Sequence, residues 1–128
     1  MIKLSSIPTE APKGLKKKKL KDETAQLIER LGELQNILYA EGKYSMLIVL
    51  QGMDGSGKDG AVRNVFHNCT IAGLDLVSFK KPTEQEFAHD FLWRVHRWTP
   101  EKGMTTIFNR SHYEDILIQR VHNWIDME

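Results

Sequence analysis

One glycine-rich run in this sequence has residue types and spacing suited to binding phosphate. Residues 52–60 read Gly-Met-Asp-Gly-Ser-Gly-Lys-Asp-Gly and lie between the apolar run Met46–Leu50 and a helical pattern. A strand, a loop and a helix in this order are the setting expected of a P-loop. Its backbone N–H groups can point into one concavity, and Lys58 adds a cation at the mouth. The glycines that we predict to bind phosphate are Gly52, Gly55 and Gly57.

Two carboxylates in this run indicate a metal ion. A standard P-loop has Ser or Thr after its lysine, and that hydroxyl binds Mg²⁺. Here Asp59 holds that position, and Asp54 lies inside the loop. A carboxylate among donors for phosphate would repel the ligand unless a cation lay between them. We therefore predict that Asp54 faces Mg²⁺. The alternatives are that Asp54 is a turn residue and that Asp59, rather than binding metal, complements the helix dipole.

The composition places few other constraints on function. The chain has 128 residues, which fits one domain or part of one. Its net charge of +1 gives no reason to expect nucleic acid or a membrane as a partner. The single cysteine, Cys69, suits a reducing compartment, and we expect it to be a small buried residue. We find no signal peptide or transmembrane run, so we expect a cytoplasmic protein.

The first 44 residues are predicted to form a basic arm and an amphipathic helix. Residues 1–19 end in a lysine-rich run, which is either a solvated tail or a surface for a polyanion. From Leu20 to about Glu41 the apolar residues recur at helical spacing, which predicts a helix docked on the main sheet. Its apolar residues are Leu20, Leu27, Leu31, Leu34 and Leu38.

Residues 45–128 are predicted to form a P-loop kinase core. Three strands, Met46–Leu50, Leu76–Phe79 and Thr105–Phe108, alternate with helices, which favours a parallel sheet sandwiched by helices in an α/β fold. One helix is expected to start at the capping box of residues 83–86, and another at Ser111. The first of these should bury one apolar face, made by Phe87, Phe91, Val95 and Trp98.

This core is predicted to have an open edge. In P-loop kinase-like folds the first strand is usually central, yet only three strands are available here. One side of Met46–Leu50 would then lack a neighbour, and an exposed apolar edge invites pairing with other strands. We therefore expect the chain to be part of a longer protein, or another chain to complete the sheet.

Cations follow the predicted strands where the ligand should bind. Lys80 and Lys81 follow the second strand and Arg110 follows the third. Because the carboxyl ends of parallel strands line the ligand crevice, we expect Lys81 and Arg110 to converge on Lys58. Arg63, in the helix after the loop, either faces the phosphates or is a surface arginine.

Further metal ligands are expected near the third strand. Asn109 stands where a P-loop protein usually has an acidic residue, and its amide oxygen can still bind Mg²⁺. Glu114 could supply the missing charge. The alternative is that Glu114 closes a capping box that begins at Ser111.

Four motifs in this order resemble the second family of polyphosphate kinases. They are the loop with Gln51 before it, then Ser-Phe-Lys-Lys-Pro-Thr at 78–83, His-Asp-Phe-Leu-Trp-Arg at 89–94 and Ile-Phe-Asn-Arg-Ser-His-Tyr-Glu-Asp at 107–115. The similarity is close over about residues 45–121. It implies a thymidylate-kinase-like fold and Mg²⁺-dependent transfer between polyphosphate and AMP, ADP or ATP. It also implies active-site roles for Asp54, Lys58 and Arg110. Separately, we expect the protein to be a homo-oligomer.

This sequence differs from many members of that family in its last motif and in its length. The last motif is similar to that of the subgroup acting on both nucleoside mono- and diphosphates, although many relatives have Asp at the position of Asn109. Family members continue into a helical lid and further strands, so we expect the 128 residues alone to have little or no kinase activity. The alternatives are a P-loop kinase that uses ATP as donor, and a truncated module that binds phosphate without turnover.

Overall fold

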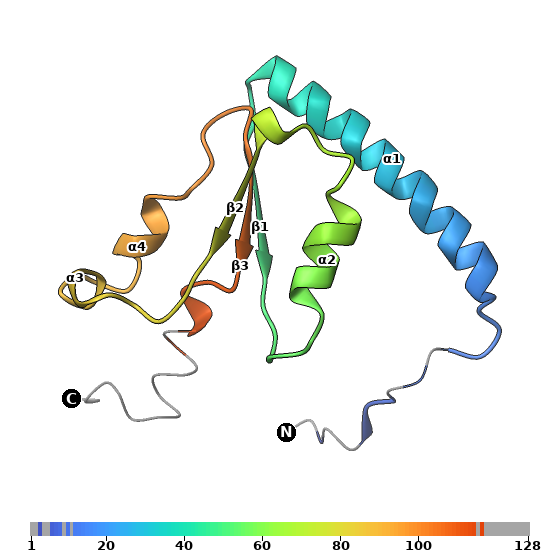
Figure 1. The fold of residues 1–128 in the computed structure, drawn as a ribbon, viewed down its shortest axis with the longest axis horizontal. Coiled ribbons are helices and arrows are strands. Elements are labelled where there is room, and N and C mark those ends of the chain that lie inside the picture. The colour runs from blue at the N-terminus through green and yellow to red at the C-terminus, as the bar shows by residue number, and fades with distance from the viewer. Residues whose placement is uncertain (1–2, 4–5, 9, 11, 115, 117–128) are drawn as a thin grey trace.

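The structure is a computed structural model that describes all residues except 1–2, 4–5, 9, 11, 115 and 117–128. Figure 1 shows its elements along the chain. They are α1 (Lys17–Glu41), β1 (Met46–Leu50), α2 (Lys58–Val65), the short 3₁₀ helix η2 (Ile71–Gly73), β2 (Leu74–Ser78), α3 (Glu84–Phe87), α4 (Trp93–His96) and β3 (Thr105–Asn109). No helix among these residues is long and apolar enough to cross a membrane. The helix predicted from Ser111 lies mostly outside the described residues.

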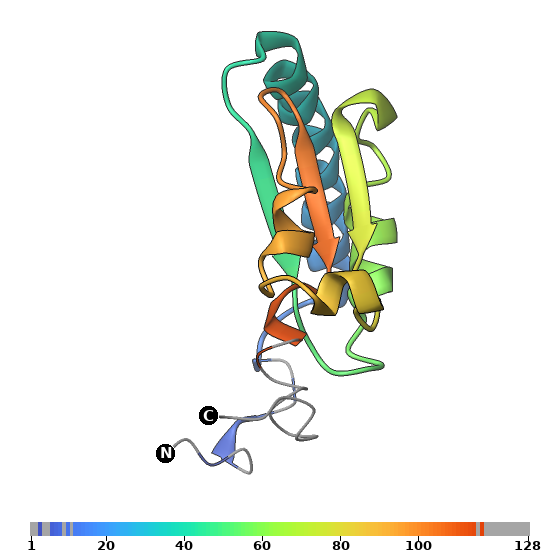
Figure 2. The same ribbon diagram turned by 90° about the vertical axis from the view of Figure 1, so that its left-hand side faces the viewer.

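The three strands form one parallel sheet in the order β1-β3-β2. Helices α1 and α2 lie on one face and α3 and α4 on the other (Figures 1 and 2). The predicted parallel α/β sandwich is thus confirmed, and only the bounds of the second and third strands differ from the prediction, by one or two residues. Leu50, Ser78 and Asn109 are aligned across the sheet, so the three strands end at the same edge. The loops that follow them are therefore neighbours.

The core is centred on β3, because it has a strand on each side. Ile107 and Phe108 have no solvent exposure. The ring of Phe108 meets that of Phe79 edge to face, with centroids 4.9 Å apart, and Val95 completes this cluster. The aromatic geometry adds to the stabilisation from apolar burial. Cys69 is buried as expected, and burial raises the pKa of its thiol.

Strand β1 is an open edge in the part of the chain that the structure describes. It pairs with β3 on one side only. Its apolar residues Met46, Leu47 and Val49 remain exposed, in contrast to those of β3. The expected unpaired side of the first strand is therefore confirmed for the described residues.

The prediction of one helix from residue 83 to Trp98 is wrong. The capping box does form: Thr83 and Glu86 exchange hydrogen bonds between their side chains and backbone N–H groups. However, α3 ends at Phe87 and α4 begins only at Trp93. Between them the carboxylate of Asp90 accepts a hydrogen bond from the Leu92 N–H at 2.9 Å, and such local bonds compete with helix formation.

The break changes which apolar side chains are buried. Of the face predicted for that helix, only Val95 reaches the core. The other three are about half exposed and are Phe87, Phe91 and Trp98.

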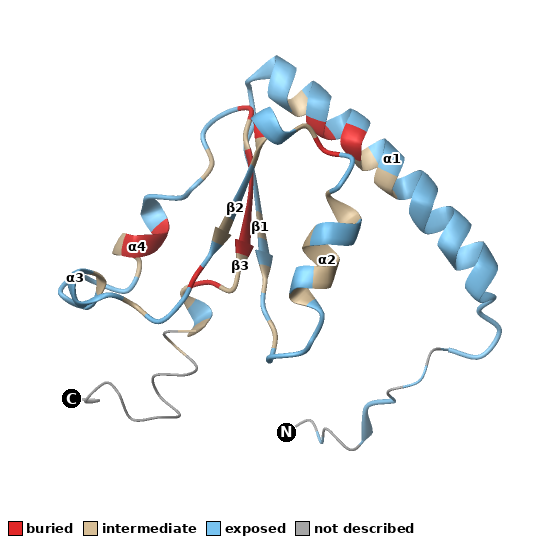
Figure 3. Ribbon diagram, viewed as in Figure 1, coloured by how far each residue is buried: buried red, intermediate tan, exposed pale blue. Residues whose placement is uncertain are grey.

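Helix α1 docks through fewer leucines than predicted. Leu27 and Leu34 are exposed, and the buried residues of the helix are Gly32 and Gln35 (Figure 3). The amide oxygen of Gln35 accepts a hydrogen bond from the Thr70 N–H at 2.9 Å. The helix is thus held by a close approach and a polar contact to the segment before β2.

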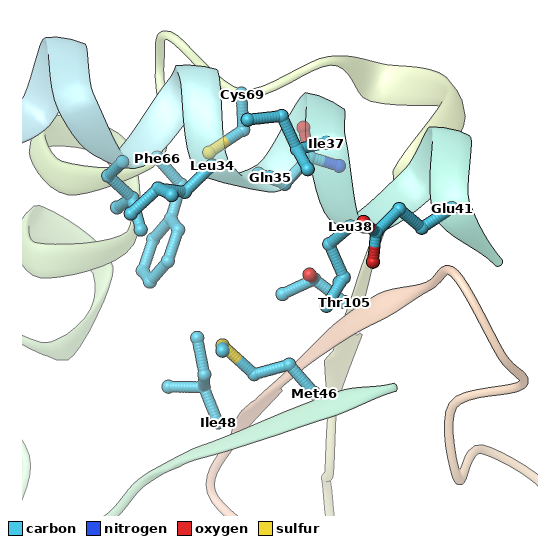
Figure 4. Close-up of a pocket in the computed structure, with 11 residues that line it drawn as sticks. Leu34, Gln35, Ile37, Leu38, Glu41, Met46, Ile48, Phe66, Cys69 and Thr105 are labelled. Atoms are coloured by element: carbon cyan, nitrogen blue, oxygen red, sulfur yellow. The ribbon is translucent and has the colours of Figure 1, made fainter. Parts of the chain in front are cut away.

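A groove lies between α1 and the start of β1. Its volume is about 330 Å³, and apolar side chains line most of it, among them Leu38, Met46 and Phe66 (Figure 4). It lies at the amino end of β1, opposite the edge that bears the glycine-rich loop. The described residues that line it include no cation, so the groove lacks the groups that phosphate binding requires.

Replacing Gly32 by Ala should test how α1 docks. A Cβ at Gly32 would lie 2.6 Å from the carbonyl oxygen of Asn68, a backbone atom that cannot move alone. We expect a loss of about 1–3 kcal/mol in the free energy of unfolding, measured by urea denaturation. The matched control is Gly60→Ala in α2, where a Cβ meets nothing within 4 Å. It should leave stability unchanged or raise it by up to about 1 kcal/mol. Equal effects at both glycines would contradict the close approach of α1.

Candidate active site

The glycine-rich loop needs its glycines for two physical reasons. Gly55 and Gly57 have φ values of 77° and 92°, a conformation that side chains with a Cβ rarely adopt. Gly57 is also the N-cap of α2. A Cβ at Gly52 would lie 2.7 Å from the Ser56 hydroxyl oxygen. The predicted loop therefore has the backbone turn that its sequence indicates, directly between β1 and α2.

The ammonium of Lys58 is held by the loop itself. Its Nζ donates hydrogen bonds to the carbonyl oxygens of Gly52 at 2.6 Å and Met53 at 2.9 Å. The side chain is thus folded back across the loop and carries its charge to the concavity. A phosphate oxygen entering there can take over one of these bonds, which makes Lys58 a cation poised at the predicted binding position.

The end of β3 brings two side chains to the loop. The Nδ2 of Asn109 donates to the carboxylate of Asp59 at 2.6 Å. The guanidinium of Arg110 pairs with the carboxylate of Asp54. Arg110 has a φ of 68°, the only positive value among the described residues other than glycine. Its N–H donates to the carbonyl oxygen of Leu50 at 3.0 Å, which joins the end of β1 to the turn after β3.

These residues surround one cavity at the carboxyl edge of the sheet. Its volume is about 240 Å³, enough for a phosphate group. The three predicted catalytic residues, Asp54, Lys58 and Arg110, all line this cavity. The lining consists of Asp54, Gly55, Gly57, Lys58, Asp59, Gly60, Asn109 and Arg110.

The donor set at this cavity fits Mg²⁺. The Oδ1 atom of Asn109 is buried without a hydrogen-bond partner, while its Nδ2 is held by Asp59. Within the described residues no three His, Cys, Asp or Glu side chains cluster to hold a metal by themselves. Mg²⁺ needs no such cluster, because it commonly binds one or two carboxylates and keeps water and phosphate oxygens as its other ligands. Asp54, Asp59 and Asn109 are thus suitably placed.

Glu114 occupies a different position from these three. Its carboxylate accepts a hydrogen bond from Gln51 Nε2 at 2.7 Å and lies 3.8 Å from a nitrogen of Arg110. It does not line the cavity. These contacts suit a third role that we did not expect from the sequence, which is to orient the guanidinium of Arg110 together with Asp54. Gln51 was also missed, although its position directly after β1 is a signal that could have identified it.

Three predicted cationic phosphate ligands, and Gly52 of the loop, do not line this cavity. Lys80 and Lys81 are exposed in the turn after β2, at the same edge of the sheet but separated from the loop by the end of β3. Arg63 is exposed on α2. The structure does not bring these three to Lys58, so their binding of phosphate stays a prediction.

The fold and the loop define the class of this chain: an α/β protein of the P-loop type. Within that class, the family model described as "Polyphosphate kinase 2 (PPK2)" matches residues 14–128. The chain therefore belongs to the polyphosphate kinase 2 family.

Individual relatives agree with this membership. The chain is 53% identical over 104 residues to the AMP/ADP-polyphosphate phosphotransferase of Meiothermus ruber, covering 81% of this chain and 39% of that protein. It is 47% identical over 95 residues to the ADP-polyphosphate phosphotransferase of Rhodopseudomonas palustris, covering 74% of this chain and 33% of that protein. The crystal structure of Polyphosphate Kinase 2 from Arthrobacter aurescens TC1 matches with a TM-score of 0.85 and 40% identity, over 98% of this chain and 47% of that one. The chain thus spans less than half the length of each of these relatives.

Proposed function

We propose that this chain carries the phosphate-binding core of a kinase that transfers a phosphoryl group between inorganic polyphosphate and AMP or ADP. Family membership and the names of the relatives support the reaction class. The observation that carries the proposal is the cavity that Lys58, Arg110 and Asp54 line together with Gly55 and Gly57 of the loop. Phosphoryl transfer depends mostly on positioning and charge neutralisation, which these groups can supply.

The residues have distinct tasks in this proposal. The loop and Lys58 bind the terminal phosphoryl group of polyphosphate. A phosphate oxygen of AMP or ADP, already ionised, attacks that phosphorus in line, and the bond to the next phosphate of the polymer breaks. Polyphosphate leaves one unit shorter, and no side-chain nucleophile or proton acceptor is required. Arg110 stabilises the charge on the transferring oxygens, and Asp54 with Glu114 holds its guanidinium in place.

Mg²⁺ is the cofactor that we propose for this site. Asp54, Asp59 and Asn109 would hold it, and it would supply positive charge that neutralises the phosphates. The unpaired Oδ1 of Asn109 supports this assignment. The carboxylate of Asp54 pairs with Arg110 and would also lie beside Mg²⁺. Its negative charge would therefore be neutralised by a cation and would not repel the phosphate.

Compartment and assembly are further parts of the proposal. The proposed substrates are those of the cytoplasm, where a lone thiol such as Cys69 stays reduced. We propose that the whole protein is a homo-oligomer without nucleic-acid or membrane partners. Size-exclusion chromatography with light scattering would test the oligomer, and a monomer would contradict it.

The deciding experiment supplies one phosphoryl donor at a time. Full-length protein is incubated with Mg²⁺, AMP or ADP, and either polyphosphate or ATP as sole donor, and the nucleotides are separated by chromatography. We expect polyphosphate to drive formation of ADP and ATP. Transfer to AMP from ATP but not from polyphosphate would show instead an ordinary nucleoside monophosphate kinase. Polyphosphate binding without any transfer would show a module that binds phosphate only.

A further inference from the structure

The turn that follows β2 carries two predicted phosphate ligands but has no regular structure. Residues 80–83 leave the sheet beside the end of β3, since the Phe79 N–H donates to the Asn109 carbonyl oxygen at 3.1 Å. Lys80 and Lys81 are both exposed in this turn. A flexible turn would hold these two charges poorly, because long lysine side chains already lose conformational entropy when they bind a ligand.

A buried arginine ties down the start of this turn. Arg94, in α4, is only 7% exposed. Its guanidinium donates a hydrogen bond to the carbonyl oxygen of Lys80 at 2.8 Å and lies over the ring of Phe79, 5.1 Å from the centroid. Burying a cation is costly unless it is paired and hydrogen-bonded, so a packing role alone would be better filled by an apolar residue.

Glu86 links this arginine to the end of the same turn. One carboxylate oxygen of Glu86 lies 3.5 Å from Nε of Arg94. The other accepts a hydrogen bond from the Thr83 N–H at 2.8 Å, within the capping box of α3. The two ends of the turn, Lys80 and Thr83, are therefore connected through a single ion pair. The planar fork of arginine presents one nitrogen to the carbonyl oxygen and another to the carboxylate in a fixed geometry, which the flexible ammonium of lysine does not provide.

We propose that Arg94 is a positioning residue, which with Glu86 fixes the 80–83 turn so that Lys80 and Lys81 bind polyphosphate in one arrangement. This inference rests on the proposed function. Arg94 itself touches no substrate and acts through the turn. Its effect should therefore fall on polyphosphate binding, while the transfer step at Lys58 and Arg110 stays intact.

The test measures KM for polyphosphate and kcat in the full-length protein. Arg94→Met should raise KM for polyphosphate about tenfold and leave kcat within about twofold, since one anchored set of charge-assisted contacts is lost. Arg94→Lys should not restore KM, because lysine keeps the charge but lacks the fork. The matched control is Arg97→Met, at an exposed arginine that stacks on Trp93 in the same segment, and it should change neither constant.

A double-mutant cycle separates positioning from general damage. In a Lys80→Met/Lys81→Met background, Arg94→Met should raise KM by less than twofold, because the charges it positions are already gone. Should Arg94→Met not fold, Glu86→Gln enters the same cycle, because it keeps an oxygen for the Thr83 N–H and replaces the carboxylate oxygen that faces Arg94 by a neutral NH₂ group. The same tenfold rise in both backgrounds, or a fall in kcat alone, would overturn the inference. Failure of the wild-type protein to use polyphosphate would instead refute the proposed function, and direct polyphosphate binding to the variants would still decide the role of Arg94.

Discussion

Replacing Lys58 by Met is expected to lower kcat/KM for polyphosphate by about 10²–10³-fold, as when one preorganised donor to the transferring group is removed. The variant keeps the length of the side chain but cannot donate a hydrogen bond. In the structure Nζ of Lys58 is already placed over the loop by the carbonyls of Gly52 and Met53, so little reorganisation precedes binding. The measurement is steady-state formation of ATP by the full-length protein, together with polyphosphate binding by calorimetry.

Lys102 offers the matched control for that substitution. It is an exposed lysine in the turn before β3, at the edge of the sheet opposite the cavity. Lys102→Met removes the same charge and should leave binding and turnover unchanged. If both lysine variants retained the affinity of the wild type, the loop would not be the phosphate site.

Replacing Arg110 by Gly or by Ala is expected to reduce transfer by about 10³-fold or more, in the range of arginines that stabilise a transferring phosphoryl group. The two variants should differ in stability, because Arg110 has a φ of 68°. Both lose the same ion pairs to Asp54 and Glu114, but only alanine keeps the Cβ that this conformation penalises. Thermal unfolding should therefore show the glycine variant at least as stable as the alanine variant.

The two readouts distinguish a catalytic role from a structural one. If Arg110 served only to stabilise the turn after β3, the more stable variant would also be the more active. We expect both to be equally inactive despite the difference in stability. Recovery of transfer by Arg110→Gly alone would contradict the role that we assign to the guanidinium.

Several features of the fold could be predicted because they depend on residues that are close together in the sequence. The continuous apolar run Met46–Leu50 predicted a strand with the bounds that the structure shows. The capping box at Thr83 and Glu86 also formed as expected. Residues adjacent in the chain determine both the strand and the capping box, so neither prediction required knowledge of a tertiary contact.

The two predictions about helices that were wrong, for residues 83–98 and for the docking of α1, share a different cause. The pattern of residues 83–98 looked like one helix, yet the side chain of Asp90 binds the backbone and breaks it. The leucine spacing of α1 suggested an apolar docking face, yet the helix is held at Gly32 and Gln35. In each case a specific partner outweighed a periodic pattern, and helical periodicity alone cannot say what lies opposite a residue.

The sequence by itself determined the glycine-rich loop and the alternation of strands and helices, because glycine spacing and apolar runs act over a few residues. Only the tertiary structure decided that Arg110 meets Asp54, 56 residues away, that Asn109 meets Asp59, 50 residues away, and that Arg94 is buried beneath the turn after β2. These pairs depend on β3 lying between β1 and β2. The order of strands in a sheet follows from packing across the whole chain, and no local run of residues encodes it.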